Sequence, residues 1–255
     1  MMKELTVVVN SCDKHKVAWC PFFTLLWKMW PTLDCPVVLN TETLKFEDNR
    51  VKTVNSSIKY SWSKRFYECL KRIKTEYVLV FLEDFFLENK VNEDIVKRAF
   101  KHIKKDKSIA CISFMNTPDG VKESDELKGF AELNKKAKYR MNCQAGLWNK
   151  RILMKLLRSH ESAWEFEVLG SKRSKRYSCR FFSILKNQEF PFDYSWGKPI
   201  YRGFWNLQAV RQVEERGGIK INIDNLPCIE DMDKLPSQPK TKKNIKNILR
   251  RIKSL

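Results

Sequence analysis

The stretch YVLVFLEDFFLENK, residues 77–90, decides the fold that the sequence predicts. Six apolar residues precede two adjacent acids, Glu83 and Asp84, and three apolar residues follow them. Neighbouring residues of a strand point to opposite faces, so at least one carboxylate must face something other than the core. Ionised carboxylates are almost never fully buried without a cation or a metal. We therefore expect a buried strand over 77–82 with a cationic partner at its end.

Predicted strands and helices alternate on both sides of this segment. β-branched and apolar runs indicate strands, and apolar residues at helical spacing indicate helices. The expected segments are strands over 5–12, 36–42 and 109–116 and helices over 16–31, 62–74 and 92–106. Asn92 is the expected N-cap of the last helix. This alternation predicts the α/β class, with a mostly parallel sheet covered by helices on both faces.

The second half of the chain is expected to complete one domain, residues 1–233. We expect a loop containing Gly146, then a helix near 148–158, then a helix over 207–218 that stops at glycine. The last predicted strand covers 219–224. Two prolines and the lack of apolar periodicity indicate a linker over 234–243.

The composition is that of a folded, strongly basic protein. The chain has 255 residues, and 49 lysines and arginines against 30 acids give a net charge of +19. This balance indicates an anionic partner: nucleic acid, an anionic membrane surface or a phosphorylated substrate. Basic residues cluster over 97–107, over 172–180 and near the C-terminal end. A nucleic-acid-binding protein is the competing class, but without a zinc-finger, RNP or KH motif we expect no nucleic acid partner.

Cysteine usage and hydropathy indicate a cytoplasmic protein. The eight cysteines are scattered without a Cys-x-x-Cys pair, so we expect reduced thiols and no zinc site. The first residues enter a predicted strand without the apolar region of a signal peptide. No uninterrupted apolar stretch approaches the roughly 20 residues of a membrane helix.

Polar residues follow three of the predicted strands. They fall at 10–13, at 40–42 and at 83–84, where parallel strands would end. Because ligands of such sheets bind at the carboxyl ends of the strands, these residues are expected to form one site. The candidate ligand-binding residues at these ends are Asn10, Ser11, Asp13, Asn40, Glu83 and Asp84.

An N-terminal nucleotide-binding strand followed by an apolar strand with an acidic pair resembles the layout of the GT-A glycosyltransferases. VLVFLEDFF is similar to their acidic strand, and SWSKRFYECLKRIKTEY resembles the helix before it. Over residues 3–225 the chain resembles, more narrowly, the bacterial glycosyltransferases of capsule, O-antigen and other surface-polysaccharide clusters. The resemblance implies transfer of a sugar, in the hexosyltransferase class, from a nucleotide-sugar donor to a saccharide acceptor.

In that family an acidic motif, usually Asp-x-Asp, holds a divalent metal against the donor diphosphate. The resemblance therefore implies Mn²⁺ or Mg²⁺ at Asp84 and Glu83. Here Phe85 follows the pair, so the second carboxylate of a strict Asp-x-Asp is missing, and one acid would act through water or the sugar hydroxyls. Catalysis without metal is the alternative, with Lys64 and Arg65 as candidates for the donor's phosphates or base.

Two other classes share part of this pattern. A nucleotidyltransferase also uses an acidic metal site on an α/β sheet, but the chain has no Gly-rich phosphate loop. A binding protein that kept the fold and lost catalysis remains the other alternative.

The segment WEFE, residues 164–167, resembles a GT-A element that carries an acid near the start of a late helix. In inverting members this acid deprotonates the acceptor hydroxyl, so the resemblance implies Glu165 or Glu167 as the catalytic base. Trp164 would desolvate the carboxylate and raise its pKa, or stack on a sugar ring. Gln144 and Trp148 are candidates for the acceptor side, with core packing as the other interpretation of Trp148.

The last residues, 244–255, predict a basic amphipathic helix. Aliphatic residues at helical spacing would form one face and cations the other, which is typical of helices that lie on anionic membranes. The residues expected at the membrane include Ile245, Ile248, Leu249, Arg250, Arg251 and Ile252. We therefore expect a peripheral protein on the cytoplasmic face of the inner membrane, acting on a lipid-linked saccharide, with docking on its own domain as the alternative.

Overall fold

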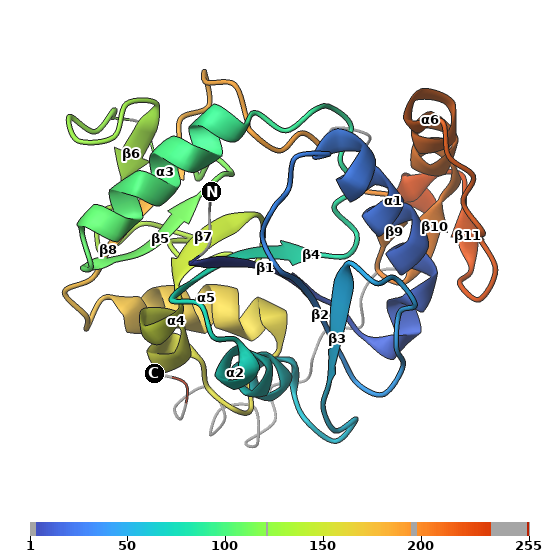
Figure 1. The fold of residues 1–255 in the computed structure, drawn as a ribbon, viewed down its shortest axis with the longest axis horizontal. Helices are drawn as coiled ribbons and strands as arrows, with labels where there is room; N and C mark the ends of the chain where they lie inside the picture. The colour runs from blue at the N-terminus through green and yellow to red at the C-terminus, as the bar shows by residue number, and fades with distance from the viewer. Residues whose placement is uncertain (1–3, 121, 195–197, 236–253, 255) are drawn as a thin grey trace.

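The acidic strand lies inside an eight-stranded sheet in the computed structural model, which describes residues 4–120, 122–194, 198–235 and 254 (Figure 1). The strands of this sheet are β1 (Leu5–Asn10), β2 (Val37–Thr41), β3 (Val51–Asn55), β4 (Tyr77–Leu82), β5 (Ile109–Ser113), β6 (Phe130–Glu132), β7 (Gly146–Asn149) and β8 (Arg180–Ile184). A second sheet contains β9 (Ile200–Tyr201), β10 (Phe204–Asn206) and β11 (Cys228–Ile229). The α-helices are α1 (Trp19–Met29), α2 (Trp62–Arg72), α3 (Glu93–Lys105), α4 (Lys150–Leu156), α5 (Ala163–Ser174) and α6 (Leu207–Gly217), and the 3₁₀ helices are η1 (Asp13–Ala18) and η2 (Met232–Lys234).

The order and direction of the strands confirm the mostly parallel sheet. The order is β3-β2-β1-β4-β7-β5-β8-β6. Strands β3, β2, β1 and β4 are parallel neighbours, and β5 is parallel to β8. Strand β7 runs antiparallel to both β4 and β5, and β6 runs antiparallel to β8. The carboxyl ends of β1, β2 and β4 therefore lie at one edge of the sheet.

Helices cover both faces of the sheet, as the sequence predicts (Figure 1). Helices α1 and α3 pack in one core with Val7 and Val9, whereas α2, α4 and α5 pack in a second core with Val8 and Val80. Successive residues of β1 belong to different cores because they point to opposite faces of the sheet. Burial on both faces explains why these strands are continuous apolar runs.

Side chains and a glycine set the ends of several helices. The Oδ1 of Asn92 accepts a hydrogen bond from the backbone N–H of Ile95 at 3.4 Å, which confirms the predicted N-cap of α3. Asn149 caps α4 in the same way through Ile152, at 3.2 Å. Gly218 ends α6 with φ +59, the left-handed conformation that favours glycine.

The fold differs from the sequence interpretation at several places, and strands β6, β8, β9, β10 and β11 were not expected. Residues 219–224 form no strand, because the backbone N–H of Ile221 donates to Oε1 of Glu214 at 2.9 Å while the side chain packs into the core. Gly146 begins strand β7, although a loop was expected there, and four residues are too few for a periodic signal. The sequence interpretation also lacks β3, in which exposed and half-buried residues interrupt the apolar pattern.

The C-terminal region is described only in part. Lys234 belongs to η2, so the expected linker begins inside a 3₁₀ turn. The remainder of the linker from residue 236, and the helix predicted over 244–255, lie outside the described residues apart from Ser254. The hydroxyl of buried Ser254 lies 2.8 Å from Nε2 of His160, and its carbonyl accepts from Arg173. No helix among the described residues is long and apolar enough to cross a membrane.

Candidate active site

The carboxyl ends of β1, β2 and β4 lie side by side where these strands end, and this region is called here the acidic edge. In the parallel register Asn10 pairs with Asn40 on one side and with Leu82 on the other. Glu83 and Asp84 directly follow Leu82, so the two asparagines and the two acids share this edge. This is the edge at which ligands of open α/β sheets bind.

Asn10 and Asn40 form a buried pair of amides. The Nδ2 of Asn40 donates to Oδ1 of Asn10 at 2.8 Å. The remaining atoms, Nδ2 of Asn10 and Oδ1 of Asn40, are buried and have no hydrogen-bond partner among the described residues. A buried polar atom without a partner costs roughly 1–3 kcal/mol. These two atoms are therefore suited to a polar ligand at the edge.

Asp13 and Ser11 hold loops together. The carboxylate of Asp13 accepts from the hydroxyl of Thr41 at 2.8 Å and from the backbone N–H of Thr43 at 3.1 Å. Burial opposes ionisation of Asp13, but the hydrogen bonds from Thr43 and Thr41 lower its pKa. The hydroxyl of Ser11 accepts from Nε1 of Trp19 at 2.7 Å. Asp13 thus connects the segments after β1 and β2, whereas the hydroxyl of Ser11 contacts the start of α1.

The two basic candidates of α2 are paired within the protein. Nη1 of Arg65 lies 2.7 Å from Oε1 of Glu42, with both side chains 10% exposed. Its Nη2 donates to the carbonyl of Ser11 at 3.4 Å. Lys64 pairs with Glu68 on its own helix at 2.8 Å. Arg65 therefore connects α2 to the loops after β1 and β2, and both cations pair with carboxylates of the protein, while their contact with donor phosphates stays a prediction.

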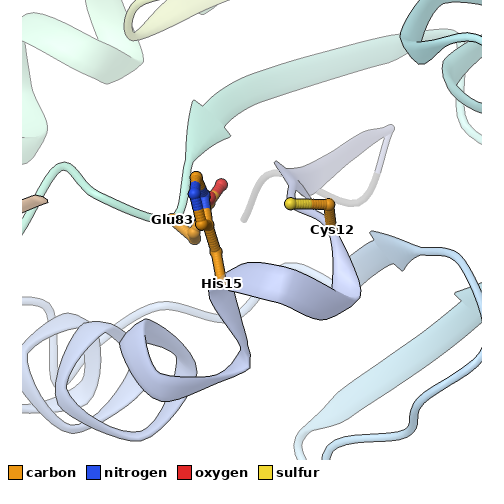
Figure 2. A group of neighbouring side chains, drawn as sticks. All are labelled: Cys12, His15 and Glu83. Carbon is orange, nitrogen blue, oxygen red and sulfur yellow. The ribbon is translucent and has the colours of Figure 1, made fainter. Parts of the chain in front are cut away.

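Glu83 lies near two side chains that follow β1, Cys12 and His15, of which His15 belongs to η1 (Figure 2). Its Oε1 is 2.5 Å from Nδ1 of His15. Together with Sγ of Cys12 they form a group of three ligand atoms that all lie within 4.8 Å of one another. The hydrogen bonds with Cys12 and Glu83 raise the pKa of His15 to about 10. His15, when protonated, is the cationic partner that the sequence interpretation expects for the acidic pair.

One carboxylate oxygen of Asp84, Oδ1, is buried. Its Oδ1 has no hydrogen-bond partner among the described residues. Burial, followed by the charge of Glu83, raises the pKa of Asp84 to about 7. The next residue, Phe85, stacks on Tyr194 with the ring centroids 5.0 Å apart, so the surroundings are partly aromatic. An unpaired carboxylate beside another acid is suited to bind a cation.

The donor atoms at this edge fit a divalent cation. Mg²⁺ and Mn²⁺ prefer oxygen ligands, and the unpartnered oxygen of Asp84 beside Glu83 offers them. Zn²⁺ also takes thiolate and imidazole ligands, which Cys12 and His15 place next to the same Glu83. The expectation of no zinc site missed the Cys-x-x-His spacing of residues 12–15. Glu83 is common to both sets of ligands.

The two glutamates of WEFE have different surroundings in α5. Oε2 of Glu165 accepts from the backbone N–H of Ser162 at 2.8 Å, and the Ser162 hydroxyl accepts from the N–H of Glu165 at 3.3 Å. These two bonds form a capping box at the start of the helix. Glu167 accepts from the backbone N–H of Cys143 at 2.8 Å, and burial raises its pKa. Glu165 therefore caps the helix, and burial makes Glu167 the better candidate for the base, while the choice between the two glutamates stays a prediction.

Glu167 lines a cavity of about 240 Å³, called here the acceptor cavity. The residues that line it are Met115, Asn116, Thr117, Pro118, Tyr139, Asn142, Gln144 and Glu167. Gln144 thus lies beside the candidate base, where the sequence interpretation places it. A carboxylate with a raised pKa in a polar cavity is able to take a proton from a hydroxyl that binds there.

The two tryptophan candidates do not line the acceptor cavity. Trp148 is 2% exposed and packs between Phe166 and Phe181, with ring centroids 6.2 and 6.1 Å away. The prediction that Trp148 contacts the acceptor is therefore wrong, and its core interpretation is correct. Trp164 is 58% exposed on α5, and its role in stacking on a sugar stays a prediction.

Lys198 connects the acidic edge with the acceptor cavity. Its positive charge opposes the rise in pKa of both Asp84 and Glu167. The two carboxylates therefore share one nearby cation. The sequence interpretation named neither Lys198 nor His15, and only His15 carried a local signal, its spacing from Cys12.

Comparisons with known proteins show the fold. No family model matches the sequence, and no curated protein matches it. TarS from S. aureus aligns with a TM-score of 0.50 and 14% identity over 73% of this chain and 36% of that chain. TarS 1–349 in complex with UDP-GlcNAc aligns with a TM-score of 0.41 and 14% identity, over 74% of this chain and 60% of that chain.

A cytidylyltransferase from Leptospira borgpetersenii serovar Hardjo-bovis also aligns, with a TM-score of 0.48 and 11% identity, over 86% of this chain and 98% of that chain. In the alignment with TarS, this chain spans 36% of the TarS chain, little more than a third. The shared feature is a GT-A-like α/β fold with a mostly parallel central sheet.

Proposed function

We propose that this protein is a glycosyltransferase that moves a sugar from a nucleotide-sugar donor to a saccharide acceptor. The observation that carries the proposal is the buried Oδ1 of Asp84 after the carboxyl end of β4, which has no hydrogen-bond partner in the described part of the chain. By the resemblance to GT-A enzymes, the donor diphosphate would bind at this place. Nδ2 of Asn10 and Oδ1 of Asn40 support the proposal, because among the described residues they have no hydrogen-bond partner and are therefore available to a ligand at the same edge. The hexosyltransferase class and a role in surface-polysaccharide synthesis belong to the same proposal.

The residues of the site divide the work between donor and acceptor. Asp84 and Glu83 would hold Mn²⁺ or Mg²⁺, which supplies positive charge for the leaving diphosphate. Glu167 takes the proton of the acceptor hydroxyl, and its raised pKa brings it closer to the proton affinity that this step needs. Gln144 orients the acceptor beside Glu167 in the acceptor cavity.

Ligand-induced thermal stabilisation tests the donor class. UDP-GlcNAc and UDP are the first ligands to try, because TarS is known in complex with UDP-GlcNAc. Each is added with Mn²⁺, Mg²⁺, Zn²⁺ or EDTA, and a ligand at 100 times its Kd should add about 2.7 kcal/mol of stability. CTP serves as the probe for a nucleotidyltransferase. Stabilisation by CTP alone, or by no nucleotide sugar, would contradict the proposal.

A matched pair of variants assigns the metal to the acidic edge. Asp84→Asn should lose the metal-dependent part of the stabilisation by UDP-GlcNAc. Asp94→Asn, which removes one exposed acid from α3, should keep it. If both variants keep the full metal effect, the cation binds elsewhere or the reaction needs none.

We also propose that the acceptor is lipid-linked and that residues 242–255 hold the protein on the cytoplasmic face of the inner membrane. The support is the pattern of aliphatic residues and cations in the sequence. Full-length protein should sediment with anionic vesicles at low salt and be partly released at high salt. The variant Arg250→Glu with Arg251→Glu should bind much more weakly. Equal binding by both proteins would assign this segment to docking, for which the contacts of Ser254 provide a site.

A further inference from the structure

A second cavity, of about 270 Å³, lies next to the acceptor cavity and is called here the basic cavity. The residues that line it are Lys136, Ala137, Lys138, Tyr139, Val168, Ser171, Lys172 and Lys175. Four of these eight are lysines and none is an acid. Tyr139 lines both cavities, and Val168 directly follows the candidate base Glu167. The two cavities are therefore parts of one continuous surface.

The lysines of the basic cavity come from two segments that are far apart in the sequence. Lys136 and Lys138 lie in the loop after β6, and Lys172 and Lys175 lie one turn apart in and just after α5. None of these four ammonium groups forms an ion pair with an acid among the described residues. Elsewhere exposed lysines do pair, as Lys97 does with Glu93 at 2.7 Å. Four unpaired cations around one cavity repel one another and favour an anion between them.

Tyr139 lies between the two cavities in a conformation that tyrosine rarely adopts. Its φ is +51, and 48% of the residue is exposed. A bulky residue in the left-handed region costs about 1–3 kcal/mol, and such strain persists only where the surroundings enforce it. The structure therefore keeps an aromatic ring at the surface between the acceptor cavity and the basic cavity.

The residues beside Tyr139 provide that enforcement. Arg140 is buried, and its guanidinium donates to the carbonyls of Ser174 and Cys179 at 3.1 and 2.8 Å. On the other side, the backbone N–H of Lys138 donates to Oδ2 of Asp119 at 2.7 Å. The loop backbone is thus fastened on both sides of Tyr139 before any ligand binds. Preorganisation of this kind reduces the entropy lost on binding.

We propose that the basic cavity binds a phosphate group of the acceptor saccharide while Tyr139 stacks on one of its sugar rings. The proposal rests on the proposed function, because it needs Glu167 to mark the reacting end of the acceptor. Lysine is a suitable phosphate ligand as a compact charge, and the flat apolar face of tyrosine suits a sugar ring. The substrate class is therefore a phosphate-bearing saccharide. The phosphate belongs either to the glycan itself or to a lipid carrier.

Titration with a hexose phosphate, in the presence of saturating UDP to occupy the donor site, tests the proposal. The cavity variant is Lys138→Glu with Lys172→Glu, and the control variant is Lys101→Glu with Lys105→Glu on α3. Both variants change the net charge equally, so any difference between them comes from the position of the charges. The cavity variant should bind hexose phosphate at least tenfold more weakly, whereas the control should change by about twofold or less. Equal losses in the two variants, or none in the cavity variant, would overturn the proposal.

Three further measurements separate the parts of the proposal. Tyr139→Ala should weaken binding of hexose phosphate but leave binding of inorganic phosphate unchanged, and equal effects on both would exclude stacking. Unphosphorylated hexose should bind the wild type and the cavity variant equally.

If the cavity variant loses binding to phosphatidylglycerol vesicles while keeping its binding to hexose phosphate, the cavity serves the membrane and the proposal fails. UDP binding is measured in parallel, so failure of the donor site is distinguishable from failure of the basic cavity.

Discussion

Glu83 and Asp84 end a buried strand, whereas Glu165 and Glu167 lie in the first two turns of a helix. In each pair one carboxylate is used by the fold, Glu83 against His15 and Glu165 in the capping box. The other carboxylate of each pair has a pKa that burial raises. The two regions thus share a division of roles between neighbouring acids, although their backbones are different.

The difference between the regions lies in what surrounds the second carboxylate. Asp84 has an oxygen with no partner among the described residues, in an aromatic environment beside another acid. Glu167 keeps one hydrogen bond, from Cys143, and opens on a polar cavity. The first environment is suited to a bound cation, and the second to proton transfer with a hydroxyl. Burial alone therefore does not assign a role to an acid. The role follows from the kind of partner, a cation or a hydroxyl, that the surroundings of the carboxylate favour.

Asp84→Asn should produce the largest effect on activity. Replacing the carboxylate by an amide of the same shape removes the charge that holds the cation, so transfer should fall by roughly 10³-fold or more. Steady-state turnover with the donor found by thermal stabilisation measures it, and circular dichroism checks the fold. Turnover within tenfold of the wild type would remove Asp84 from the mechanism and contradict its assignment to cation binding.

Glu167→Gln should produce the next largest effect. Loss of a general base lowers turnover by typically 10²- to 10⁴-fold, while donor binding should hardly change. The wild-type rate should fall as the pH decreases through the raised pKa of Glu167, since only the ionised form takes a proton. The variant should lack this acid limb. An unchanged pH profile in Glu167→Gln would show that another group is the base.

Asp84 also predicts a measurable cost of the site to stability. Its pKa lies near 7 instead of 3.8, so over this pH interval the folded state keeps a proton that the unfolded state loses. Stability from this group is therefore present below about pH 4 and lost as the pH rises through 7. One pKa unit corresponds to about 1.4 kcal/mol, which sets an upper limit of about 4 kcal/mol.

Asp84→Asn should therefore be more stable than the wild type above pH 7 in EDTA, by on the order of 2 kcal/mol. The difference should vanish near pH 4. Denaturant unfolding at several pH values measures it. Parallel stability curves for the two proteins would mean that Asp84 is not held in an unfavourable environment, and the contrast with paired Glu83 would lose its basis.

Local patterns predicted much of the fold and one side of the site. The apolar run of β4, the N-cap Asn92 and the stop at Gly218 are signals carried by neighbouring residues. The acids of β4 were recognisable because they interrupt an apolar run. Residues 219–224 have the alternation of a strand, yet no strand pairs with them, and the sequence does not show whether a partner is present.

The acceptor side was less predictable because it depends on contacts between distant segments. Tyr139 is placed by Arg140, whose partners lie 34 and 39 residues further along the chain. The lysines of the basic cavity converge only after β6 and α5 have packed together. A Trp between Leu147 and Asn149 is compatible with a core position and with a ligand contact alike, which is why Trp148 was open to both interpretations.

The capping box predicts the smallest effect and gives the sharpest test of the comparison. Glu165→Gln and Ser162→Ala each remove part of the same cap, so each should lower the free energy of unfolding by about 1 kcal/mol. Turnover of both variants, measured below their melting temperatures, should stay within about twofold of the wild type. Because Ser162 belongs to the cap and not to the candidate chemistry, Ser162→Ala shows how much activity a weakened helix start costs. If Glu165→Gln lost turnover by 10²-fold or more while Ser162→Ala did not, Glu165 would be the base, and the division of roles within this pair would be the reverse of the one inferred from its hydrogen bonds.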